Sequence, residues 1–474
     1  MRTLFILFIL TATGCGAREA CAQNAEPQKS GYQIKFELKG EKNKDVILAI
    51  YYGSSKYSID TAQLDRHGKA EFSGAKPLSP GMYLFASDGA QLFDFLISDT
   101  VNQNFTVFTT KGKLLETLSF DGSPENQAFA DFTRFMADIQ KTQQKHDLKN
   151  ADSLQLQQYR DEEALLDKKT EDKVKEISEQ YPKSLLSSIA NAMMYPKPKT
   201  SELPADKSEQ QRYIYKFMKT HYWDKLTLTD HRMQNTPILI PAIDNYFATI
   251  IPQIPDSIIH AIDKMLDKAQ TDTAMTKFLV GHIFNKYLKM KTIMGMENVI
   301  IHLIDNYYLS GKVKTDDEKF MTSITEFADK NRVSLIGKQA QNLKMESLTG
   351  TPEALYDIDS PYTLVYIFEP SCGHCKVETP KIYKVFQEYK DKGLAGFCVY
   401  NLHNKEEWVE YIAANNFTDW INVWDPKNEA DFRTAYSVYS VPQVYVLDKD
   451  KKIVGRGLES VSLAQLLAHL LKNK

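Results

Sequence analysis

Two cysteines separated by two residues carry the clearest chemical signal in this chain. Cys372 and Cys375 follow the apolar run 363–368 and precede a stretch, 382–389, in which apolar residues recur at helical spacing. The run predicts a strand buried on both faces, and the spacing predicts a helix. Free N–H groups and the positive dipole end of a helix start stabilise a thiolate, and a C-x-x-C pair there lowers the pKa of its first thiol from roughly 8.5 to 7 or below. We therefore expect Cys372 to attack disulfides and Cys375 to resolve the mixed disulfide.

The composition is that of a globular protein of several domains with little net charge. The 474 residues are 43% hydrophobic and 25% charged, and a chain of this length exceeds a single hydrophobic core. A formal net charge of −3 without a basic block argues against nucleic acid or an anionic membrane surface as the main partner. No internal run reaches the roughly 18 apolar residues that a membrane helix needs.

Residues 1–22 have the pattern of an export signal. Arg2 precedes the apolar run 4–10, which is too short to span a membrane. Two cleavage patterns compete: Cys15 stands where a lipoprotein signal places its lipidated cysteine, and Ala20-Cys21-Ala22 fits cleavage between small residues. Both predict export to the periplasm or cell envelope, and the first adds a lipid anchor at Cys15.

Outside the signal region one further cysteine remains. Cys398 lies in the apolar run 394–400, so we interpret it as a small core residue. A structural zinc site needs four ligands, and neither a second cysteine pair nor an H-E-x-x-H spacing accompanies Cys372 and Cys375. We therefore expect no metal and no cofactor. One close cysteine pair in an exported chain indicates redox work in an oxidising compartment.

The pattern along the chain predicts three domains. Residues 31–120 alternate apolar and polar side chains in short runs between turns, which predicts an antiparallel β-sandwich or barrel-like domain. Residues 123–334 open with the helix-start signal Ser123-Pro124-Glu125 and continue with apolar stripes at helical spacing, which predicts an all-α domain. Residues 335–474 form a third domain that holds the dithiol.

This third domain resembles the thioredoxin-like family, in particular its exported TlpA-like and AhpC/TSA-like branches. The family pattern C-x-x-C-x-x-E-x-P is matched by Cys372, Cys375, Glu378 and Pro380, and the segment 439–448 is similar to the strand that carries the family's cis-proline. The resemblance implies an α/β thioredoxin fold and thiol–disulfide oxidoreductase activity. The two upstream domains resemble the paired uncharacterised domains that precede thioredoxin-like domains in exported Bacteroidetes proteins, which assigns them no function.

The resemblance also implies roles for single residues. Glu378 would assist proton transfer at the dithiol with a pKa raised by burial, and a solvated helix position is the alternative. Val441 and Pro442 would form a cis loop that faces the dithiol and pairs with an extended substrate. Gly373-His374 is the dipeptide of protein disulfide isomerase, where a cation favours a more oxidising couple. The TlpA-like branch is reducing, so the direction of electron flow stays open.

Three functions follow, in order of preference. The first is an exported enzyme that exchanges disulfides with envelope proteins and with a redox partner protein. The second is an envelope binding or assembly protein with a secondary redox role, because residues 31–334 exceed the dithiol domain in length. The third is a thiol peroxidase. Peroxide chemistry needs a polarising Thr three residues before the cysteine, and Glu369 occupies that position, which argues against this function.

Overall fold

The computed structural model describes residues 31–474 except 100–102, 147–150, 195, 291–293 and 472–474. The predicted signal region 1–22 and the lipidation candidate Cys15 lie outside the described residues. By their contacts the residues form two compact units. One ends at Ala49 and resumes from Ser58 to Ala137, and the other comprises Ile50–Tyr57 and Asp138–Lys474. The finer division at 31–120, 123–334 and 335–474 stays a prediction.

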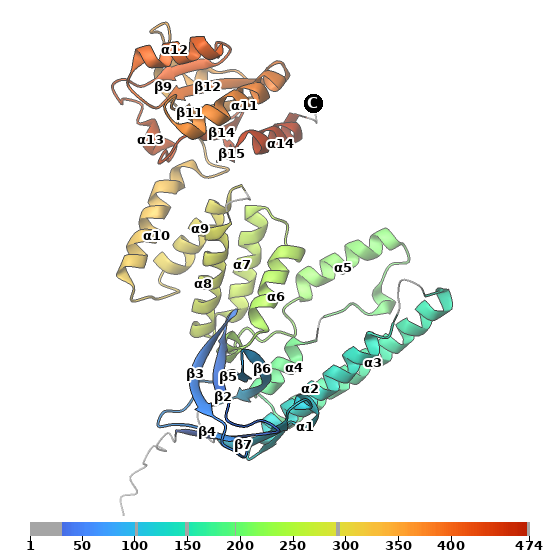
Figure 1. The fold of residues 1–474 in the computed structure, drawn as a ribbon. Helices are drawn as coiled ribbons and strands as arrows, with labels where there is room; N and C mark the ends of the chain where they lie inside the picture. The colour runs from blue at the N-terminus through green and yellow to red at the C-terminus, as the bar shows by residue number, and fades with distance from the viewer. Residues whose placement is uncertain (1–30, 100–102, 147–150, 195, 291–293, 472–474) are drawn as a thin grey trace, which may run out of the picture. The chain divides into compact units, whose positions relative to one another are not determined.

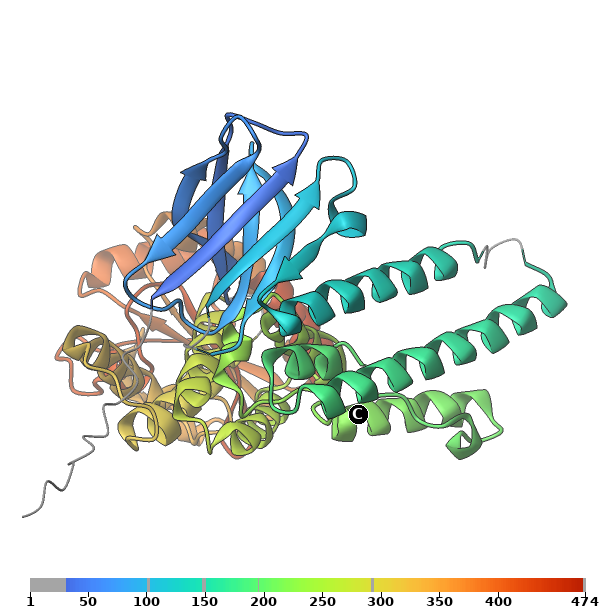
Figure 2. The ribbon, with the colours of Figure 1, turned by 90° about the horizontal axis from the view of Figure 1, so that it is seen from below.

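The strands near the N-terminus form two four-stranded sheets, drawn in blue in Figure 2. One sheet has the order β4-β1-β7-β8 and the other β3-β2-β5-β6. Phe36 on the first sheet stacks on Phe85 of the second with ring centroids 4.8 Å apart, so aromatic side chains fill the space between the sheets. The strands are β1 (Tyr32–Lys39), β2 (Asp45–Tyr52), β3 (Ser55–Gln63), β4 (Lys69–Gly74), β5 (Gly81–Ser87), β6 (Ala90–Ile97), β7 (Asn104–Thr110) and β8 (Ser119–Asp121).

The predicted β-rich domain is confirmed, with one correction. We expected antiparallel pairing throughout, but β1 pairs with β7 in parallel, from Gln33 opposite Asn104 to Lys39 opposite Thr110. The alternation of buried and exposed side chains in β1 is compatible with either pairing, because the pleat has the same period in both. The pattern therefore predicted the faces of the strands and not their directions.

A largely helical region follows. Its main helices are α2 (Pro124–Gln143), α3 (Ser153–Gln180), α4 (Leu185–Ala192), α5 (Lys207–His221), α6 (Leu239–Asn245), α7 (Pro255–Ala269), α8 (Thr273–Lys289), α9 (Met296–Leu303) and α10 (Glu318–Asn331). Helices α7, α8 and α9 lie side by side (Figure 1). Side-chain caps begin several of them; for example, the N–H of Phe320 donates to Asp317 at the start of α10 (2.9 Å). The charged helix α3 has few buried side chains, as expected for a solvated helix.

The C-terminal part contains a seven-stranded sheet with the order β10-β9-β13-β12-β11-β14-β15. The central strand β11 (Tyr362–Phe368) pairs with β12 (Leu394–Tyr400) in parallel and with β14 (Gln443–Asp448) antiparallel. From Thr363 to Phe368 every residue of β11 is buried, which confirms the strand predicted to be covered on both faces. The remaining strands are β9 (Lys344–Ser347), β10 (Pro352–Ala354), β13 (Ile421–Trp424) and β15 (Ile453–Arg456).

Helices cover both faces of this sheet. One face packs against α11 (Gly373–Tyr389), α12 (Lys405–Asn415) and α14 (Ser460–Leu471) in a core that includes Phe386, Trp408 and Leu463. The other face packs against α13 (Phe432–Ala435) and the chain around Leu343 and Leu355. The predicted class is therefore confirmed: a β domain, a helical region and an α/β thioredoxin-like fold. In the described part of the chain, no helix has the length and apolarity to cross a membrane.

Candidate active site

The dithiol lies where the central strand leads into a helix, as predicted. Cys372 is the residue that immediately precedes α11, with extended backbone angles (φ −70°, ψ 125°), and its N–H donates to the carbonyl of Glu369 over 3.3 Å. Cys375, in the first turn of α11, is fully buried, whereas Cys372 is partly exposed. Only the first of the two sulfurs is therefore open to a substrate.

The two thiols have opposite electrostatic surroundings. The N–H of Cys375 is the main cause that lowers the pKa of the Cys372 thiol below its ordinary value, and the N–H of His374 adds to it. Burial raises the pKa of Cys375 to about 12. The thiolate therefore forms more readily on Cys372 than on Cys375.

The loop at Val441-Pro442, which is distant from Cys372 in sequence, faces this cysteine. The Val441–Pro442 peptide bond is cis, and the Cys372 thiol donates to the carbonyl oxygen of Val441 with 3.5 Å between Sγ and O. The structure thus brings together Cys372, Cys375, Val441 and Pro442. Gly373 and His374 are exposed on the same helix start. His374 acts on the dithiol through its backbone N–H, a contribution that its side-chain type did not predict.

The expectation of a raised pKa at Glu378 is wrong. Burial alone would raise it, but the N–H of Ser460 donates to Oε2 over 3.0 Å and the Lys381 ammonium lies 2.9 Å from Oε1, and together they hold the pKa of this carboxyl below its usual value. The carboxylate is buried, not solvated, and accepts a hydrogen bond at the first residue of α14. These contacts join two helices; a proton-transfer role for Glu378 stays a prediction.

A different carboxylate, Glu369, lies beside the dithiol. It follows the last residue of β11, and the side-chain amide of Asn401 donates to its Oε1. Its negative charge raises the pKa of both Cys372 and Cys375, although other groups have larger effects. The sequence contained one signal for this residue: an acid at the end of a buried strand, three positions before the nucleophile.

Other candidate groups take no part in the dithiol site. Cys398 is fully buried and its burial raises the pKa of its thiol well above the usual value, as expected for a core cysteine. Among the described residues, no group of three or more His, Cys, Asp or Glu side chains is arranged to hold a metal.

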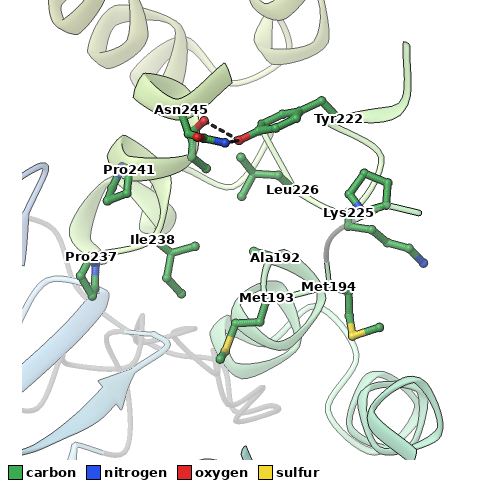
Figure 3. Close-up of a pocket in the computed structure, with 12 residues that line it drawn as sticks. Ala192, Met193, Met194, Tyr222, Lys225, Leu226, Pro237, Ile238, Pro241 and Asn245 are labelled. Carbon is green, nitrogen blue, oxygen red and sulfur yellow. Dashed lines mark hydrogen bonds between the residues drawn. The ribbon is translucent and has the colours of Figure 1, made fainter. Parts of the chain in front are cut away.

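The helical region contains a hollow of about 490 Å³, shown in Figure 3. Apolar side chains such as Met193, Leu226 and Ile238 line it. Three of its polar groups bond to each other: Tyr222 Oη donates to the Ala242 carbonyl (2.8 Å) and accepts from Asn245 Nδ2 (3.0 Å). Lys225 also lines the hollow, whose surface is otherwise mainly apolar.

Comparisons with known families match three segments. Residues 336–456, which include both cysteines and Val441-Pro442, match the AhpC/TSA family. Residues 32–129 match DUF4369 and residues 158–331 match DUF5106, both described as domains of unknown function.

Three individual proteins are similar to parts of this chain. The thiol-disulfide oxidoreductase ResA of Bacillus cereus is 27% identical over 149 residues, which cover 31% of this chain and 82% of ResA. A solved domain of a possible thiol-disulfide isomerase from Cytophaga hutchinsonii is 37% identical and covers 29% of this chain and 95% of its own, with a TM-score of 0.28. A thioredoxin-like protein from Bacteroides caccae is 19% identical and covers 59% of this chain and 98% of its own, with a TM-score of 0.44.

Proposed function

Because residues 336–456 belong to the AhpC/TSA family of thioredoxin-like proteins, we propose that this chain is an exported enzyme that exchanges disulfides with envelope proteins through Cys372 and Cys375. The family and the class of enzyme, thiol–disulfide oxidoreductase, agree with the prediction from the sequence. The cellular location, the protein substrates and the roles of single residues are our proposal.

The inequality of the two thiols is the observation that carries this proposal. Cys372 is partly exposed, has a lowered pKa and contacts the Val441 carbonyl, whereas Cys375 is buried with a pKa of about 12. Disulfide exchange needs one thiolate that meets the substrate and a second thiol that waits behind it. The backbone of Val441 and Pro442 supports this order because it lines the approach to the first sulfur.

In the reducing direction, the Cys372 thiolate attacks one sulfur of the substrate disulfide. A mixed disulfide forms and the other substrate sulfur leaves as a thiolate that takes up a proton. Cys375 then loses its proton and attacks Sγ of Cys372, which releases the second substrate thiol and leaves a Cys372–Cys375 disulfide. Two electrons pass from the protein to the substrate; the same steps in reverse oxidise a substrate dithiol.

The direction of electron flow depends on the redox potential of the Cys372/Cys375 couple. N–H groups that favour the Cys372 thiolate stabilise the dithiol state and make the couple more oxidising, whereas the charge of Glu369 disfavours the thiolate. Equilibration of the full chain with glutathione buffers measures the potential: a value near −180 mV indicates an oxidant or isomerase, and one near −270 mV a reductant.

The proposed reaction is tested with the full chain and insulin as the protein disulfide. Wild type is expected to reduce insulin in the presence of a dithiol, and Cys372→Ser is not. In cells, Cys375→Ser is expected to retain envelope proteins as mixed disulfides that a reductant releases. Equal insulin rates with wild type and Cys372→Ser would sink the proposal. Partners captured without regard to Cys372 would favour the assembly protein instead, and loss of peroxide would favour the peroxidase.

Export and anchoring are tested separately. The charge at Arg2 and the apolar run 4–10 support export, and Cys15 is the candidate for lipidation. We expect labelled palmitate on the wild type and none on Cys15→Ala, with both proteins outside the cytoplasm. Label on Cys15→Ala would exclude this cysteine as the anchor.

A further inference from the structure

A groove of about 900 Å³ lies beside the loop that faces the dithiol. One wall comes from the helical region, with Leu288 at the end of α8 and Phe327 on α10. The other wall comes from the thioredoxin-like fold, with Tyr439, Ser440 and Gln443. A volume of this size is typical of sites that hold a ligand rather than single waters.

Hydrogen bonds join the two walls of the groove to each other. Ser437 lies at the centre of this contact: its Oγ donates to the Lys330 carbonyl over 2.6 Å and lies 2.7 Å from Oγ of Ser334. Arg456 donates to Asn331 Oδ1 over 2.6 Å on the same side. Because Ser334 and Ser437 are both buried, the bond between them is protected from water, and the three bonds together join the helical region to the thioredoxin-like fold beside the groove.

The groove is continuous with the reactive sulfur along the backbone. Ser440 and Gln443, which line the groove, are the residues on either side of Val441-Pro442, and Gln443 Nε2 donates to the Ser440 carbonyl over 3.0 Å. The Val441 carbonyl in turn accepts from the Cys372 thiol. The loop at Val441-Pro442 therefore connects the reactive sulfur to the groove and offers a path for a polypeptide whose cysteine is bonded to Cys372.

The lining suits the side chains of a polypeptide. Leu288 is 42% exposed and Tyr439 is 62% exposed, so apolar surface is open to solvent on both walls. The Lys330 ammonium lies 5.9 Å from the centre of the Tyr439 ring and 3.2 Å from Glu326, so charged groups lie among the apolar ones. Protein-binding surfaces usually combine apolar and polar side chains in this way.

We propose that this groove binds the extended segment next to the cysteine of a protein substrate, so that the helical region helps to select polypeptides over small disulfides. This inference rests on the proposed disulfide exchange and adds a substrate class to it. A small disulfide needs only Cys372 and the loop at Val441, whereas an extended chain, at about 3.3 Å per residue, has the length to continue past Ser440 into the groove.

The test compares two substrates on the full-length protein: insulin and hydroxyethyl disulfide. For Leu288→Glu, Phe327→Glu and the double variant, we expect the kcat/KM for insulin relative to that for hydroxyethyl disulfide to fall by about tenfold or more. The matched control is Leu165→Glu, since Leu165 is 53% exposed on α3 and lies outside the groove; its ratio is expected to equal that of wild type. An unchanged ratio in the double variant would overturn the proposal that the groove binds substrate. The same result is expected if a second copy of the chain occupies the groove. A wild type inactive on both substrates would overturn the proposed function itself.

A second measurement keeps every groove residue intact. A peptide with one cysteine and a photoreactive residue three positions away is bonded to Cys372 in Cys375→Ser and then irradiated. We expect cross-links to groove residues of the helical region, such as Leu288, Phe327 and Lys330. Cross-links confined to α11, α12 or the loop at Val441-Pro442 would overturn the proposal, because the peptide would then not reach the helical region.

Discussion

The two carboxylates on either side of the dithiol, Glu369 and Glu378, have opposite surroundings. Glu369 follows the central strand and its charge acts on both thiols. Glu378 lies in α11, and the Ser460 N–H and the Lys381 ammonium hold its charge. Glu378 belongs to the sequence motif, but it is Glu369, outside the motif, whose charge raises the pKa of the thiols. A carboxylate that is paired with its own hydrogen-bond donors and cation has less effect on its other neighbours, so a motif alone does not identify the group that acts on the sulfur.

We expect the largest loss of activity from substitution of Cys372, the thiol that lies between the two carboxylates in the sequence. We expect Cys372→Ser to lower insulin reduction to the rate of the dithiol alone, because the nucleophile is lost. Cys375→Ser is also expected to lose turnover but to accumulate the mixed disulfide, which non-reducing electrophoresis detects. Accumulation in Cys372→Ser rather than in Cys375→Ser would reverse the assigned roles.

Glu378→Ala is expected to act on stability. Loss of the carboxylate leaves the Ser460 N–H without its acceptor at the start of α14, and we expect the free energy of unfolding to fall by about 1–3 kcal/mol. Denaturant titration of the full chain measures this free energy by tryptophan fluorescence, with Trp223→Phe in both proteins so that Trp408, Trp420 and Trp424 of the C-terminal fold give the signal. Glu410→Ala is the matched control, because Glu410 is exposed on α12. An equal fall in the free energy of unfolding in both variants would contradict a structural role for Glu378.

The stability difference between wild type and Glu378→Ala depends on pH in a direction that follows from the pKa of Glu378. The folded pKa of Glu378 lies below its unfolded value of 4.5, so the stabilisation is complete above that pH and is lost as the pH falls through the folded pKa. We expect the stability difference between wild type and Glu378→Ala to be constant at neutral pH and to shrink below about pH 4.5. A difference that grows on acidification would contradict the paired, ionised carboxylate.

Glu369→Gln is expected to have a smaller effect, on reactivity. Removal of the negative charge lowers the pKa of Cys372. The gain in thiolate fraction outweighs the loss of nucleophilicity of the more acidic thiolate, so we expect alkylation below the pKa to become faster. Iodoacetamide kinetics at pH 6 measure this rate. The same acceleration in Glu378→Ala would erase the contrast between the two carboxylates.

Cys398→Ala is expected to have the smallest effect. Its thiol is fully buried in the core beside the sheet, so the substitution leaves insulin reduction unchanged and lowers stability by about 1 kcal/mol for the lost sulfur contacts. A loss of turnover in the folded variant would show that the core thiol takes part in exchange.

The sequence predicted the parts of this molecule that local patterns determine. The continuous apolar run of β11 and the helical spacing after Cys375 located the dithiol at a strand-to-helix junction, because both patterns depend only on which faces are buried. The motif also identified the loop at Val441-Pro442, which is distant in sequence from Cys372.

The remainder depended on contacts that no local pattern contains. The parallel pairing of β1 with β7 joins segments far apart in the chain. Glu378 has its pKa lowered by Ser460, 82 residues further on, and the position of Asn401 at Glu369 follows from the register of β12 beside β11. The groove beside Ser440 needs residues from α8, α10 and the loop together.

The central claim is that Cys372 is the attacking thiol and Cys375 the resolving one. The most direct test is alkylation of the reduced full chain with iodoacetamide from pH 5 to 11, followed by mass spectrometry of each cysteine. We expect Cys372 to react first, because its pKa lies below the ordinary value of a thiol, and Cys375 to stay protected until strongly alkaline pH. Equal titration of the two thiols, or earlier reaction of Cys375, would contradict it.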